Sequence, residues 1–186
     1  DIDKKICNHK NIESLVFPLE AFEKDGERIK ELSDKYTVGV LFPRVLFCGE
    51  RENAAKNLAH AKECGAGFCE ISNVGHIDVV RESGLEVYGG IGLNITNTVC
   101  AEVFADKFGI SSLVLSPELK LGGVRDIGKK DGVKYCLFAR GRLPLMVLES
   151  CIVKAGGKCK KASAPGADCA LLCDRMDMLF PVRGQK

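Results

Sequence analysis

The stretch that decides the fold is GFCEISNVGHIDVVRESGLEVYGGIGLNITNTVCAEVFADKFGISSLVLSPEL, residues 67–119. Short apolar runs alternate in it with amphipathic segments, at a spacing of roughly 22–25 residues, which is typical of βα units. Apolar strands that alternate with helices indicate a parallel sheet covered by helices. The predicted strands and helices are, in order, Gly67–Ser72, Gly75–Glu82, Leu85–Gly89, Thr96–Phe108 and Ser111–Leu115.

The pattern continues on both sides of this stretch. Tyr36–Phe47 predicts a buried strand that Pro43 ends or bulges, and Glu50–Cys64 predicts a helix that stops before Gly65. Downstream, Ser116–Leu119 has the residues of a helix start, and Val133–Ala139 predicts the last strand. Residues 1–36 read as a broken helical segment, which Pro18 interrupts.

Five strands are therefore expected, whereas a closed (β/α)8 barrel needs eight strands and about 250 residues. The sequence predicts an α/β fold, either an open parallel sheet or part of a TIM-like barrel that is completed by association. Half a barrel would leave an unpaired strand at each side, which proteins avoid. Since the first residue is Asp rather than Met, we expect a missing N-terminal half-barrel, a partner chain or a homo-oligomer to complete the sheet.

Composition indicates an ordinary globular chain of 186 residues, with 46% hydrophobic and 28% charged residues and a net charge of +2. This charge does not require a polyanionic partner. No apolar run reaches the roughly 20 residues of a membrane helix, and the start does not resemble a signal peptide. Ten cysteines in a chain of this length and regularity favour a reducing cytoplasm over a disulfide scaffold.

The C-terminal third carries four cysteines in a segment that is broken by glycine and rich in basic residues. Cys151, Cys159, Cys169 and Cys173 follow the pattern Cys-x7-Cys-x9-Cys-x3-Cys. The segment has little apolar material, so a metal would supply stability that packing cannot. Four thiolates suit a [4Fe–4S] cluster or a zinc ion, and the alternative is unligated thiols in a reducing compartment. We divide the chain into residues 1–36, a barrel-like core over 37–150 and this segment over 151–186.

Polar side chains follow each predicted strand, at the edge where parallel α/β folds gather their functional residues. Amides, carboxylates and arginines at such an edge fit a polar substrate that bears a carboxylate or a phosphate. Each residue also has a structural explanation as a helix cap or a turn former. The residues are Arg44, Glu70, Ser72, Asn73, Asn94, Asn97, Ser116, Glu118, Arg140 and Arg142.

Six ordered segments resemble peptidase family U32, which is also labelled collagenase-like protease. The resemblance covers about residues 38–183, and LSPEL followed by GRLPLM and a cysteine-rich tail carries most of its specificity. The segments are LFPR (41–44), SNVGHIDVV (72–80), GLNITNT (92–98), LSPEL (115–119), GRLPLMVLESC (141–151) and CALLCDRMDMLFPV (169–182).

The resemblance implies a barrel-like fold and a [4Fe–4S] cluster that is bound by Cys151, Cys159, Cys169 and Cys173. It also implies oxygen-independent hydroxylation of an RNA base or a small aromatic molecule, with a small anionic co-substrate. In this hypothesis Glu118 and Arg142 are catalytic, and the substrate is bound by Arg44, Asn73, Asn94 and Asn97. Two alternatives are a peptidase, in which zinc held by three of the cysteines activates water, and a metal-binding subunit without catalysis that completes another chain's barrel.

Overall fold

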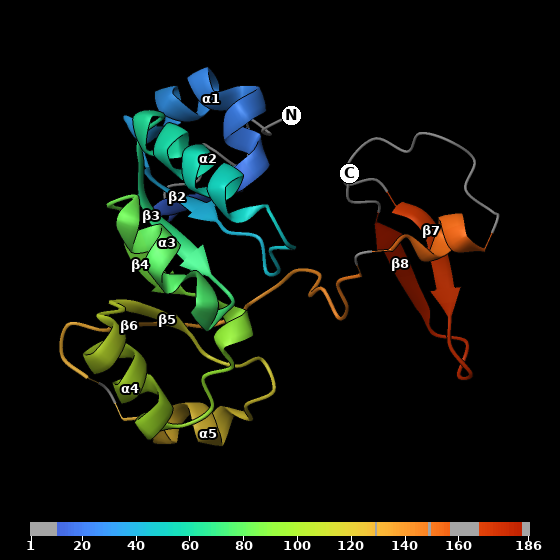
Figure 1. Cartoon of the computed structure of the whole chain (residues 1–186). Coiled ribbons are helices and arrows are strands. Elements are labelled where there is room, and N and C mark those ends of the chain that lie inside the picture. The colour runs from blue at the N-terminus through green and yellow to red at the C-terminus, as the bar shows by residue number, and fades with distance from the viewer. Residues whose placement is uncertain (1–10, 129, 149, 157–167, 184–186) are drawn as a thin grey trace. The chain divides into compact units, whose positions relative to one another are not determined.

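The computed structural model describes residues 11–128, 130–148, 150–156 and 168–183. The chain forms two compact units, Asp1–Arg142 and Leu143–Lys186, and each is described here by itself. Figure 1 shows the elements of both units along the chain.

The first unit is a parallel sheet of six strands in the order β1-β2-β3-β4-β5-β6, which curls into a half-barrel. Helices alternate with the strands, so the expectation of a partial TIM-like barrel is confirmed. The elements are β1 (Ser14–Pro18), α1 (Leu19–Ser33), β2 (Thr37–Leu41), α2 (Arg51–Glu63), β3 (Ala66–Ile71), η2 (Val74–His76), α3 (Ile77–Glu82), β4 (Glu86–Gly89), η3 (Ile91–Leu93), α4 (Thr98–Phe108), β5 (Ser112–Val114), α5 (Leu121–Asp126) and β6 (Lys134–Cys136).

The two faces of this sheet differ because side chains alternate along each strand. Val40, Cys69 and Leu113 have no exposed surface, and they belong to one core cluster that also contains Leu58 of α2 and Phe104 of α4. This is the helix-covered face. Their immediate neighbours in each strand, such as Glu70 beside Cys69 and Ser112 beside Leu113, therefore lie on the opposite, inner face of the curled sheet.

Two sequence expectations about this unit are wrong. Ser14–Pro18 is a strand that pairs with β2, whereas the sequence predicts a broken helical segment there, so the sheet has six strands rather than five. The helical part of that segment begins one residue later, at Leu19. Ser116–Leu119 is a turn in which Ser116 Oγ accepts a hydrogen bond from the Glu118 N–H at 3.3 Å, and the next helix begins only at Leu121.

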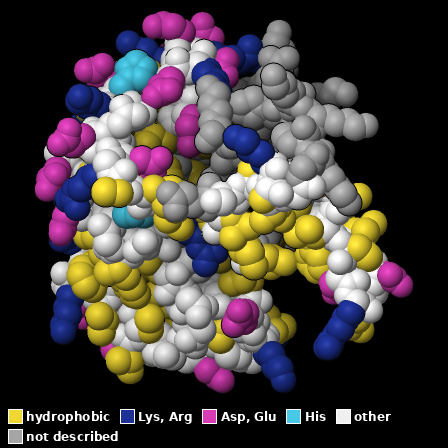
Figure 2. All heavy atoms as spheres, turned by 45° about the vertical axis from the view of Figure 1, so that its right-hand side comes forward, with side chains coloured by type: hydrophobic (Ala, Val, Ile, Leu, Met, Phe, Trp, Pro, Cys, Tyr) yellow, Lys and Arg dark blue, Asp and Glu magenta, His cyan; other side chains and the backbone are white. Residues whose placement is uncertain are grey.

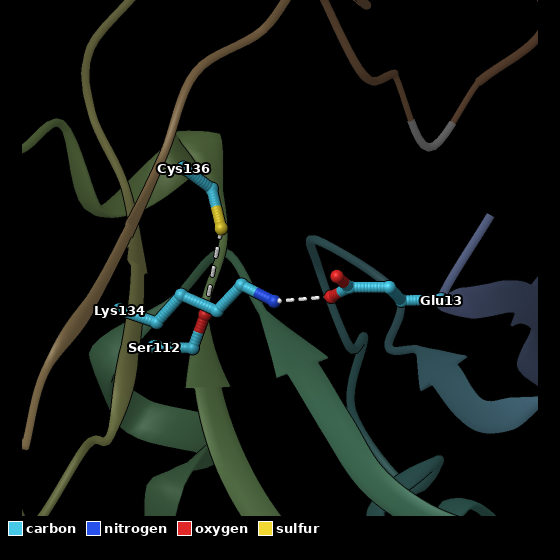
Figure 3. Close-up of polar contacts among 4 residues, drawn as sticks. All are labelled: Glu13, Ser112, Lys134 and Cys136. Atoms are coloured by element: carbon cyan, nitrogen blue, oxygen red, sulfur yellow. Dashed lines mark hydrogen bonds and ion pairs between the residues drawn. The ribbon is translucent and has the colours of Figure 1, made fainter. Parts of the chain in front are cut away.

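The curl of the sheet brings side chains from its two sides together. Lys134, in the sixth strand, donates a hydrogen bond at 3.0 Å to the Glu13 carboxylate, which immediately precedes the first strand. Figure 3 shows Lys134 reaching toward Glu13 beside Ser112 and Cys136. Within the described residues, β1 and β6 have no neighbour on their outer sides. The half-barrel is thus incomplete as described.

The second unit holds a helical turn, α6 (Ile152–Ala155), and an antiparallel hairpin of β7 (Asp168–Cys173) and β8 (Leu179–Arg183). The last two of the four cysteines, Cys169 and Cys173, both belong to β7. None of the unit's described side chains is buried. Its apolar side chains lie at the surface, where Figure 2 colours hydrophobic groups yellow; the most exposed are Leu145, Met146, Leu171, Met176, Met178 and Leu179.

Candidate functional site

The residues that the sequence singled out follow successive strands of one parallel sheet. Arg44 comes after β2, Asn73 after β3, Asn94 and Asn97 after β4, and Glu118 after β5. Because parallel strands all end at the same edge, the fold brings these side chains to the carboxyl edge of the half-barrel. Arg142 follows β6 and is the last residue of the first unit.

The three asparagines have structural tasks at this edge. Asn73 caps η2 by accepting a hydrogen bond from the Gly75 N–H at 3.0 Å, and Asn97 caps α4 by accepting one from the Cys100 N–H at 2.8 Å. Asn94 has φ 52°, a left-handed conformation that asparagine tolerates well. Capping engages the carbonyl oxygens of Asn73 and Asn97, so their NH2 groups remain the atoms with which a ligand could interact.

The charged residues of the prediction lie at the surface. Glu118 is exposed and belongs to the turn that Ser116 holds, so a backbone hydrogen bond fixes its position. Arg44 and Arg142 are also exposed, and both have interactions within the chain. Their roles as binding and catalytic groups stay predictions.

Glu70 is the least exposed acidic group of this edge, and two glycines make room beside it. A side chain at Gly90 would place its Cβ 2.6 Å from Glu70 Oε1 and 3.0 Å from Ser72 Oγ. Gly92 fits even more closely, since its Cβ would lie 2.4 Å from the Ser72 carbonyl oxygen. Burial raises the pKa of the Glu70 carboxyl group above its usual range. The glycines of GGIGLN therefore serve close packing against the end of β3.

A polar row that sequence reasoning missed crosses the inner face of the sheet. Glu70 is in register with Tyr88, Tyr88 with Ser112, and Ser112 with Lys134, so four adjacent strands present these side chains side by side. Cys136 is close to the row, with its Sγ 3.7 Å from Ser112 Oγ. Barrel interiors are usually filled by branched aliphatic residues, so this row is unusual. Polar residues inside short apolar strands were the signal that could have found it.

An aromatic pair adjoins this row toward the amino ends of the strands. The rings of Phe68 and Tyr88 stack with centroids 4.2 Å apart, and Phe68 also covers Gly39 of β2. Burial, together with the nearby Glu86, raises the pKa of the Tyr88 hydroxyl, which is therefore protonated near neutral pH. The row thus offers a carboxyl group, a phenol, a hydroxyl and an amine on one surface.

Two of the four predicted cluster ligands are described in full. Cys151 and Cys173 are free, exposed thiols in the second unit, and Cys151 Sγ accepts a hydrogen bond from the Lys154 N–H at 3.4 Å. Cys159 lies outside the described residues, and so does the side chain of Cys169. Among described residues, no three metal-ligating side chains already converge. The fit to a cluster consequently rests on the chemistry of the sulfur donors and on the free state of these two thiols.

A parallel βα half-barrel with polar residues at its carboxyl edge defines the class of this protein as a partial barrel of the TIM type. The model of Peptidase family U32 matches residues 17–176, which include β2 to β6 and most of the second unit. The chain belongs to this family. No curated protein and no solved structure matches the chain. In the part of the chain that the structure describes, no helix is both long and apolar enough to cross a membrane.

Proposed function

We propose that this U32 protein is an iron–sulfur enzyme of the oxygen-independent hydroxylation type, acting on an RNA base or a small aromatic substrate. Cys151, Cys159, Cys169 and Cys173 would hold the cluster, which when bound supplies single-electron transfer. The carboxyl edge of the half-barrel would bind the substrate.

The observation that carries this proposal is that the described residues of the unit bearing the four cysteines form no core. All buried residues among those described lie at or before Ile127, in the first unit. A two-stranded hairpin without a packed face is marginally stable in water, and segments of this size usually depend on a metal or a disulfide. Cys151 and Cys173 are free thiols, so both are available as ligands, and a bound metal would supply the order that packing does not.

The residues of the first unit would bind and orient the substrate. The amide groups of Asn94 and Asn97 can donate hydrogen bonds to a polar ring, and Arg44 and Arg142 can pair with an anionic group. Burial raises the pKa of Glu70, so this carboxyl group holds a proton more readily than an exposed carboxylate and is suited to proton transfer. Glu118, the carboxylate that the sequence favoured, is more exposed than Glu70 and less suited to proton transfer.

The test is the metal content of protein that is purified without oxygen. Iron and acid-labile sulfide at about four each per chain, with a visible absorption band, are expected for a cubane cluster. One zinc without sulfide would overturn the proposal and favour the structural or hydrolytic alternative. Protein that contains no metal would overturn both.

Single substitutions locate the ligands. Cys151→Ser and Cys173→Ser should each remove most of the iron, whereas Cys100→Ser, a substitution in α4 of the first unit, should leave iron and sulfide unchanged. The first unit has its own core, so its thermal unfolding midpoint should be unchanged in the Cys151 and Cys173 variants. Equal iron loss in the Cys100 variant would contradict the assignment.

A further inference from the structure

A cavity of about 290 Å³ lies between two consecutive βα connections at the carboxyl edge of the half-barrel. One wall comes from the connection between β2 and α2, and the other from η2 and α3. Ligands of parallel α/β folds bind at this edge, so the position alone makes the cavity a candidate site. Its lining residues are Leu46, Phe47, Cys48, Gly49, Arg51, Gly75, His76 and Val79.

The amino end of α2 borders this cavity and has no side-chain cap. Glu50 occupies the cap position, but its carboxylate accepts a hydrogen bond from the Phe47 N–H at 2.8 Å and none from the helix. The first N–H groups of an α-helix have no partner inside it, and the helix dipole makes this end favourable for anions. Arg51, the first residue of this 13-residue helix, adds a guanidinium group to the same wall.

His76 gives a second, independent indication of a ligand. The residue is only 7% exposed, it lines the cavity, and its Nδ1 has no hydrogen-bond partner among the described groups. Buried polar nitrogens without a partner are uncommon in folded proteins. The ring contacts Phe42 edge-on at a centroid distance of 5.0 Å, and a 180° rotation would exchange Nδ1 with a ring carbon without changing this packing. Rotation of the ring therefore allows a nitrogen to occupy either the Nδ1 position or the ring-carbon position opposite it, and so to face a ligand.

Charges near the cavity limit how tightly an anion could bind. Burial lowers the pKa of His76, and Arg51 lowers it further, so the imidazole is neutral near pH 7 and donates one N–H. Glu52 and Asp78 lie in the first turns of the two helices, and Glu82 Oε1 is 3.9 Å from Arg51 Nη2. The Arg51–Glu82 pair is well exposed and weak, so a ligand can compete for the guanidinium.

We propose that this cavity binds the oxyanion group, carboxylate or phosphate, of a small molecule. Arg51, the free N–H groups of α2 and His76 donate hydrogen bonds to the oxyanion, while Leu46, Phe47 and Val79 contact its apolar part. The site does not depend on the iron–sulfur proposal, because all of its residues belong to the first unit. Anion binding in the cavity and iron binding by the cysteines can therefore be confirmed or refuted separately.

Cys48 provides the assay, since its exposed thiol is on the lining of the cavity. The rate of its alkylation by iodoacetamide is followed by peptide mass spectrometry in sodium phosphate or sodium acetate, each against sodium chloride at equal ionic strength. Saturable protection of Cys48, half-complete at about 1–10 mM as expected for a weak site, supports the proposal. Protection by phosphate alone identifies a phosphate site, and protection by acetate identifies a carboxylate site. Alkylation of Cys100 should not change.

Matched variants decide whether the protection comes from this site. Arg51→Gln and His76→Phe should each raise the half-protecting concentration at least fivefold, and Glu82→Gln, which frees Arg51, should lower it about twofold. Lys56→Gln removes an exposed positive charge from the same helix outside the cavity, and it should have no effect. Amide shifts of Gly49 and Gly75 in the unchanged protein give a reading that needs no variant. The proposal is overturned if neither phosphate nor acetate has a larger effect than chloride on Cys48 alkylation and on the amide shifts. It is also overturned if Arg51→Gln changes the protection no more than Lys56→Gln does.

Discussion

Replacement of Gly92 by alanine should destabilise the first unit, because η3 lies against the end of β3 with no space for a methyl group. The added Cβ would lie 2.4 Å from the Ser72 carbonyl oxygen and 2.5 Å from Ser72 Cβ. An ordinary contact is about 1 Å longer. Backbone rather than a mobile side-chain end is in the way, so relief requires η3 to move as a whole.

The magnitude follows from two terms. Overpacking of this kind costs about 1–3 kcal/mol. Movement of η3 also breaks the hydrogen bond from the Gly92 N–H to Ser72 Oγ, which is 3.3 Å long and contributes roughly 0.5–1.5 kcal/mol. The free energy of unfolding should therefore fall by about 2–4 kcal/mol.

Gly67→Ala is the matched control. Gly67 lies in β3 immediately before Phe68, and a Cβ at this position would meet no atom within 4 Å. This substitution should be neutral or stabilise the protein by about 0.5 kcal/mol, because alanine loses less backbone entropy than glycine. Urea unfolding followed by circular dichroism compares the two variants at 25 °C. A difference of less than 1 kcal/mol between them would refute the described packing of η3 on Ser72.

Two further predictions concern Glu70 and the core. Burial raises the folded-state pKa of Glu70. The contribution of this carboxyl group to stability is therefore complete below the ordinary glutamate pKa and is lost as the pH rises through the folded-state pKa. Glu70→Gln should consequently gain in stability, relative to the unchanged protein, when the pH is raised from 4 to 8. A difference in urea midpoint that is the same at both pH values would contradict this. Leu58→Ala should cost about 2–5 kcal/mol in the same assay, because the side chain is fully buried between α2 and the sheet. Leu145→Ala, at an exposed position in the second unit, should change stability by less than about 0.5 kcal/mol.

Residues with clear periodicity gave correct predictions. The helix ending before Gly65 is present because Ala54, Leu58 and Ala61 form one buried face, and Gly65 has the positive φ of 90° that a helix stop favours. The strand Ser14–Pro18 was missed because only two of its five residues, Leu15 and Phe17, turn toward the core. A strand with one half-buried face and a proline at its end resembles a broken helix in sequence.

The candidate site was only partly predictable. The carboxyl-edge residues could be found because each follows an apolar strand, and chain order places strand ends in a parallel sheet. The row from Glu70 to Lys134 depends on the register between strands, which sequence periodicity does not determine. The cavity at Arg51 and His76 depends on how two loops pack together, and a lone histidine in a helix start gives no sign of that.

The division into two units separates the stability of the protein from its expected redox chemistry. The first unit contains every buried residue that is described, so the sheet, the carboxyl edge and the cavity can fold on their own hydrophobic core. The described part of the second unit has free thiols and no buried side chain, so in the proposed function its order would be coupled to ligation. Protein prepared without metal should therefore keep the helical and strand signal of the first unit. Loss of iron from the Cys151 and Cys173 variants, with the helical and strand signal of the first unit unchanged, is therefore the result that the proposed cluster predicts.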